Sequence, residues 1–177
     1  MKAKAALFTL FAVLTLPFLA VAEEVTINYT YEGTIRPDFS NMSRGPLKVG
    51  EFTDSRGGNP NQIVDGYEAD RPLADIVRDA LIQGLEKGKA GLVDSGENMS
   101  LVGAIESTEM QMVDGSIQLT IRTRVQLQGS GRTIWQTVLF GRGTVPESDG
   151  MAKAVAGAMD RTIRGLVQDD YFLIEVL

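Results

Sequence analysis

The sequence predicts an α+β fold: a two-layer sandwich of a mainly antiparallel sheet, with a three-stranded meander, and two amphipathic helices on one face. Two segments carry apolar stripes at helical spacing, and three consecutive segments alternate like strands. Two-residue turn signals join those three segments. A closed β-barrel is the weaker alternative, because it would leave the two helices without another surface to cover.

Two strands are expected near the amino-terminal end. Residues 24–32 alternate apolar and polar side chains, which is the period of a half-buried strand. Leu47, Val49 and Phe52 suggest a short second strand. The stretch 53–71 is poor in apolar residues and is expected to be a long loop.

The two helices are predicted from their ends as well as from their stripes. Pro72 suits the first turn of a helix, and Gly88 is a natural stop. After Pro146, the pair 148–149 (Ser-Asp) can cap the second helix. The apolar stripe of this second helix comprises Met151, Ala154, Val155, Ala158, Met159, Ile163, Leu166 and Val167.

The meander is expected over residues 100–112, 116–128 and 131–142, with two-residue turns at 114–115 (Asp-Gly) and 129–130 (Gly-Ser). Strict pairing then places the following residues on the buried face: Val102, Ala104, Met110, Met112, Ile134, Val138 and Phe140. Trp135 and Leu139 then lie on the exposed face of the sheet. A three-residue loop over 129–131 would slip the register by one and exchange the two sets of the third strand.

The first 22 residues have the pattern of a secretory signal peptide. Lys2 and Lys4 precede an apolar run over 5–19, and 20–22 (Ala-Val-Ala) is a small-x-small cleavage site. A transmembrane anchor is the alternative, but the run falls short of the ~20 residues that cross a bilayer and contains a proline. We therefore expect one domain over 23–177, located in the periplasm or secreted.

Missing residue types exclude several kinds of chemistry. The chain has no cysteine and no histidine, so disulfides, lipidation at a cysteine, zinc sites and Ser-His or Cys-His triads are excluded. The formal net charge of −6 disfavours nucleic acid and anionic lipid as partners. No cofactor or metal motif is present: Asp65, Glu68 and Asp70 do not have EF-hand spacing. We expect a protein that is not an enzyme.

Two surfaces are candidates for binding a partner. Arg122 and Arg124 project together from the exposed face of the meander, and in the two-residue register Trp135 lies across from Arg124. An ordinary solvated sheet face explains the same residues more simply. The C-terminal residues 171–177 are either an exposed partner-binding strand or a segment docked on the core, and docking is the simpler explanation.

Over residues 46–170, the chain resembles the YajG-like family of bacterial envelope lipoproteins. The resemblance rests on 52–56 (Phe-Thr-Asp-Ser-Arg), 61–63 (Asn-Gln-Ile) and 72–73 (Pro-Leu), followed by the long hairpin and a closing helix. It implies a small α+β envelope domain with no known enzymatic activity. The chain departs from the family by having no lipobox cysteine, which puts outer-membrane anchoring in doubt.

Asp54 and Arg56 carry the most specific part of that motif. At a strand end they could pair across a turn and fix the loop that leaves the strand, and this structural role is favoured over ligand binding. The leading functional hypothesis is a non-enzymatic envelope domain that binds another envelope protein or itself. The alternatives are a small-molecule binder using a cleft between the 53–71 loop and the sheet and, last, a hydrolase using Asp65 and Asp70.

Overall fold

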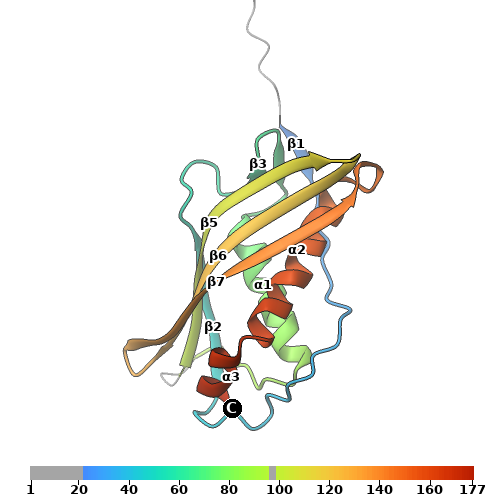
Figure 1. The fold of residues 1–177 in the computed structure, drawn as a ribbon. Helices are drawn as coiled ribbons and strands as arrows, with labels where there is room; N and C mark the ends of the chain where they lie inside the picture. Colours follow the sequence, from blue (N-terminus) through green and yellow to red (C-terminus); the bar gives the residue numbers. More distant parts are fainter. Residues whose placement is uncertain (1–21, 96–98) are drawn as a thin grey trace, which may run out of the picture.

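The computed structural model describes residues 22–95 and 99–177, and its main feature is an open four-stranded sheet (Figure 1). The strands are β2 (Leu47–Asp54), β5 (Met99–Val113), β6 (Ser116–Gly129) and β7 (Arg132–Pro146), in the order β2-β5-β6-β7. β2 pairs with β5 in parallel, and the other pairs are antiparallel. The predicted signal segment lies outside the described residues, apart from Ala22.

The helices lie on one face of this sheet (Figure 1). α1 (Leu73–Lys87) packs against β2, whereas α2 (Gly150–Val167) packs mainly against β7. A 3-10 turn, η1 (Glu147–Asp149), leads into α2, and α3 (Asp170–Val176) closes the chain. The predicted α+β sandwich is therefore confirmed, and the sheet does not close into a barrel. Gly88 ends α1 as predicted, while Asp149 precedes α2 without a capping side-chain hydrogen bond.

The segment expected to be a loop contributes two strands to a second, smaller sheet. β3 (Gln62–Val64) and β4 (Tyr67–Ala69) form a short hairpin, and β1 (Glu23–Val25) pairs with β4 in parallel. Each of these strands has only three residues, so the alternation of side chains is too short to be distinguished from a loop.

The expected strand at 24–32 is only partly correct. Pairing ends at Val25, although the alternating burial continues through Ile27 and Tyr31. The backbone beyond β1 is bonded by side chains instead: Ile27 N donates to Asp70 Oδ1 at 3.1 Å, and Tyr31 N donates to Gln83 Oε1 at 2.8 Å. The alternation of apolar and polar residues here shows which side chains are buried, but it does not show that the segment pairs as a strand.

The predicted register of β7 was wrong. The turn between β6 and β7 is Ser130-Gly131, both with positive φ (51° and 75°), one residue later than expected. The displaced two-residue turn shifts the pairing by two residues and keeps the predicted facing, but a bulge beside Leu127 adds one residue to β7 and reverses it. Trp135 and Leu139 are consequently buried, as in the exchanged arrangement of the two sets.

The opposite side of β7 is the one that faces solvent. Ile134 and Val138 are partly exposed, and Phe140 is largely exposed. The residue sets thus match the alternative assignment, although the turn itself has two residues.

A second bulge corrects the expectation for β5. The register shifts between Ile105 and Ser107, so Leu101 and Ile105 face the core, whereas Val102 and Ala104 lie on the partly exposed face. Beyond the bulge the predicted pairing holds, with Met110 opposite Leu119 and Met112 opposite Ile117. Met110 is partly buried, but Met112 is half exposed near the Asp114-Gly115 turn.

The C-terminal segment is a helix and not a strand. Asp169 caps α3 by accepting from Phe172 N at 2.8 Å. Phe172 and Val176 are docked in the core, whereas Tyr171 and Ile174 face solvent. Docking was therefore the correct alternative for one face of this segment.

Two glycines of β7 allow α2 to lie directly against the sheet. A Cβ at Gly143 would stand 1.9 Å from the carbonyl oxygen of Ala154, and one at Gly141 would stand 2.7 Å from that of Ala158. Backbone atoms of a helix and a strand cannot move apart without losing their shared packing. These two positions therefore tolerate only glycine.

We expect Gly143→Ala to lower the free energy of unfolding by about 3 kcal/mol or more, because the new methyl group overlaps a backbone carbonyl. Chemical denaturation measures the change. Gly91→Ala is the matched control, since no atom lies within 4 Å of its would-be Cβ. Equal stability of the two variants would contradict this account of the α2–β7 contact.

Candidate functional site

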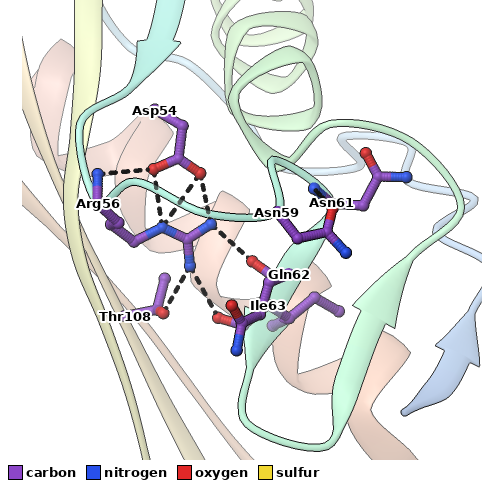
Figure 2. Close-up of polar contacts among 7 residues, drawn as sticks. All are labelled: Asp54, Arg56, Asn59, Asn61, Gln62, Ile63 and Thr108. Carbon is purple, nitrogen blue, oxygen red and sulfur yellow. Dashed lines mark hydrogen bonds and ion pairs between the residues drawn. The ribbon is translucent and has the colours of Figure 1, made fainter. Parts of the chain in front are cut away.

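Asp54 and Arg56 form a closed ion pair at the end of β2 (Figure 2). Arg56 Nε donates to Asp54 Oδ1 at 2.9 Å, and Nη2 donates to Oδ2 at 2.6 Å. The backbone N of Arg56 also donates to Asp54 Oδ1 at 3.0 Å, as expected for a turn organised by an aspartate. Both side chains are nearly buried, with exposures of 11% for Asp54 and 13% for Arg56.

The rest of the guanidinium binds two other strands. Nη2 donates to the carbonyl oxygen of Gln62 at 2.6 Å, and Nη1 donates to that of Ile63 at 3.1 Å. Nη1 also donates to Thr108 Oγ1 at 2.8 Å. An arginine has five N–H donors, and these partners occupy all five. We call Asp54, Arg56 and these three partners the Arg56 clamp.

The clamp holds the small sheet against the large one. Asp54 ends β2, Thr108 is in β5, and Gln62 and Ile63 begin β3, so a single side chain joins three strands (Figure 2). No donor of Arg56 remains for a ligand. The predicted pairing of Asp54 with Arg56 is therefore present, and its geometry favours a structural role over ligand binding.

A groove of about 510 Å³ lies beside the clamp, between the β3–β4 hairpin and β5. This is the cleft expected between the 53–71 loop and the sheet. Its acidic groups already have partners, because Asp65 accepts from Gln62 Nε2 at 3.0 Å and Glu106 pairs with two arginines. The groove therefore offers few unpaired groups with which to select a charged ligand.

The loop acids do not come together as a catalytic or metal site. Asp70 is used to bond the backbone N of Ile27, whereas Asp65 lies at the groove. Within residues 22–95 and 99–177, no three acidic side chains are grouped so that they could hold a metal ion. Asp65 and Asp70 therefore make different contacts in the fold.

The outer face of the large sheet carries a second cluster. Glu106, displaced by the bulge in β5, accepts from Arg124 Nε at 2.7 Å and lies 3.6 Å from Arg122 Nη2. The guanidinium of Arg122 lies over the ring of Phe140, 5.2 Å from its centroid. Phe140 is nevertheless 53% exposed. We call these four residues the outer-face cluster.

Trp135 does not belong to this cluster, contrary to the predicted two-residue register. Its side chain is only 7% exposed and packs against Phe172, with ring centroids 5.1 Å apart. Its Nε1 donates to Asp169 Oδ1 at 3.2 Å. Trp135 therefore anchors α3 to the sheet.

Sequence reasoning missed Glu106 and Phe140. Phe140 would have been found by the alternative register, which puts even-numbered residues of β7 on the outer face. A bulge such as the one at Glu106 has no clear sequence signal, because it depends on the fit of neighbouring strands. Arg122 and Arg124 lie on the outer face as predicted.

No family model and no curated protein matches this chain. The fold of this chain recurs in solved structures. A Xanthomonas campestris protein described by the family DUF330 aligns with a TM-score of 0.57 and 17% identity, covering 83% of this chain and 91% of that one. A minor lipoprotein from Acinetobacter baumannii aligns with a TM-score of 0.50 and 10% identity, covering 76% and 96%.

At these identities the comparison shows a shared fold and leaves the YajG-like resemblance unconfirmed. The fold is that of a DUF330 protein and of a lipoprotein. None of the described helices combines the length and the apolar character needed to span a membrane.

We expect Arg56→Lys to destabilise the protein by about 2–4 kcal/mol, because an ammonium cannot reproduce the forked contacts to Asp54 and two carbonyls. Urea unfolding measures the change. Arg44→Lys is the control: its pair with Glu175 is more exposed, so a loss below about 0.5 kcal/mol is expected. A loss at Arg56 as small as the control's would show that the clamp does not hold the two sheets together.

The clamp also predicts a pH dependence. Burial raises the pKa of Asp54, but the hydrogen bonds and charge of Arg56 outweigh burial and hold the pKa below its ordinary 3.8. The stabilisation that the Asp54–Arg56 pair gives to the folded state is therefore complete above pH 3.8. It is lost as the pH falls through the pKa that Asp54 has in the folded protein, which is below 3.8. Asp54→Asn should be less stable at neutral pH and lose less stability on acidification. Parallel acid losses in both proteins would refute this assignment.

Proposed function

We propose that this protein is a non-enzymatic cell-envelope domain that binds another protein through the outer face of its four-stranded sheet. The observation that carries the proposal is Phe140, which is 53% exposed and held in place by Arg122 on the face opposite the helices. A large exposed aromatic ring with an ordered arginine beside it is typical of the residues that dominate binding energy at protein interfaces.

The outer-face cluster also has the organisation of an interface. Glu106 pairs with Arg122 and Arg124, so their long side chains are partly ordered before a partner arrives. Ordering in advance reduces the conformational entropy lost on binding. Val138 lies across from Arg124 and extends the apolar surface next to Phe140. This surface thus places apolar side chains beside ordered charged groups, a combination that protein-binding surfaces use.

The location in the envelope is supported by two independent observations. The first 22 residues have the charge, apolar run and small residues of a signal peptide. The fold is also that of a protein named as a minor lipoprotein. This chain has no cysteine to carry a lipid, so we infer a periplasmic or secreted domain that is held at its place of action by a protein partner.

A small-molecule binder remains the second candidate, because the groove beside the Arg56 clamp exists where it was expected. The groove ranks behind the outer face because every donor of Arg56 is already bonded. Binding of a small anion there would require the clamp to open.

We expect Phe140→Ser to reduce capture of the partner from solubilised envelope extract at least about tenfold, a typical loss at an interface hot spot, with little loss of stability. Quantitative pull-down with the tagged 23–177 domain measures this. Ile174→Ser on α3 is the control, since Ile174 is also exposed but lies on another element. A protein captured equally by wild type and Phe140→Ser, or no specific capture at all, would count against the proposal.

A further inference from the structure

The two edge strands of the large sheet, β2 and β7, differ in whether other groups bond their outward backbone atoms. At the β2 edge, Val93 N donates to the carbonyl oxygen of Leu47 at 3.1 Å. Arg78 of α1 donates to the carbonyl oxygens of Gly50 at 2.8 Å and Val49 at 3.2 Å. These contacts, with the irregular pairing after Val49, protect this edge against a further strand.

The β7 edge has no comparable protection. β7 is 15 residues long, and its regular pairing with β6 continues from Trp135 to Pro146. In the part of the chain that the structure describes, β7 shares backbone hydrogen bonds with β6 alone, and none of the side-chain hydrogen bonds goes to its outward N–H and C=O groups. In an antiparallel pair every second residue directs these groups away from its partner, so a row of unpaired donors and acceptors remains.

The strand at this edge is basic, although the protein as a whole is acidic. β7 contains Arg132 and Arg142, both exposed, and no acidic residue. Arg161 lies on α2, three residues after Ala158, which contacts β7. At this spacing the two residues lie on the same side of the helix, and Arg161 is exposed. β7 itself thus carries two positive charges and no negative one, although the whole chain has a formal charge of −6.

We propose that β7 accepts an extended, acidic segment of a partner protein as a fifth strand of the sheet. The proposal deepens the proposed function, because it names the binding mode and the chemistry of the partner segment. Backbone pairing supplies affinity without regard to sequence, and the arginines along the edge select acidic side chains. Alternate side chains of the added strand would lie on the outer face, next to Phe140.

A second copy of the chain fits this edge less well. Paired β7 strands lie about 4.8 Å apart, whereas packed helices need about 8–10 Å between their axes. Gly143 allows α2 to lie directly against β7, so two copies would bring their α2 helices too close together. The arginines of the two edges would also repel each other.

Amide hydrogen exchange of the 23–177 domain tests the proposal. The probe is a synthetic peptide of about ten residues, a usual upper strand length, that alternates Glu with Thr and Val. We expect the peptide to slow exchange in Arg132–Pro146 and to leave Leu47–Asp54 unchanged. The same peptide with Lys in place of Glu should protect neither strand.

Charge reversal tests the role of the arginines. The double variant Arg142→Glu, Arg161→Glu should weaken binding of the acidic peptide about tenfold or more, because two attractive charges become repulsive. Lys87→Glu on α1 makes the same kind of change on an exposed position away from this edge and should leave the affinity unchanged.

Three results would overturn the inference: no protection of β7 at millimolar peptide, equal protection by the Lys peptide, or a dimer of the free domain in light scattering in which amide exchange of β7 is already slowed. The proposed function can fail separately. If Phe140→Ser abolishes partner capture while the acidic peptide neither protects β7 nor competes, only the strand-addition inference is wrong. If the peptide protects β7 but Phe140→Ser captures the partner normally, only the outer-face proposal is wrong.

Discussion

The arrangement of the two sheets depends on the guanidinium group of Arg56. Its five donors bind Asp54, Thr108 and the backbone of β3, so one nearly buried side chain sets the position of the small sheet relative to β2 and β5. A lysine could not do this, because the contacts require a planar fork with donors on several sides. Arg56, Gln62 and Thr108 of the clamp also line the neighbouring groove.

The second constraint is the close approach of α2 to β7. Gly141 and Gly143 remove two side chains from the inner face of an edge strand, and the helix backbone takes their place. The helix covers the inner face, yet the edge of β7 stays open and its outer face carries Phe140. The same packing that stabilises the fold therefore leaves an edge and a face available to a partner, while Arg78 closes the opposite edge.

The register of β7 shows where local reasoning fails. A shift of one residue exchanges the two faces of a strand, whereas moving a two-residue turn by one position shifts the pairing by two residues and preserves them. The bulge beside Leu127 therefore decides whether Trp135 or Phe140 is buried. Gly129, Ser130 and Gly131 offer several turns of similar local quality. Packing of Trp135 on Phe172 and its hydrogen bond to Asp169 stabilise the bulged register, and these partners are more than thirty residues away.

The sequence by itself determined the two long helices, the meander, the absence of histidine and cysteine chemistry, and the pairing of Asp54 with Arg56. These features follow from periodicity, composition or contacts within two or three residues. Only the tertiary structure decided the short strands β1, β3 and β4, the bulge that places Glu106 beside Arg124, and the difference between the two sheet edges. Each of these depends on groups brought together from distant parts of the chain. A local sequence pattern does not show which distant groups come into contact.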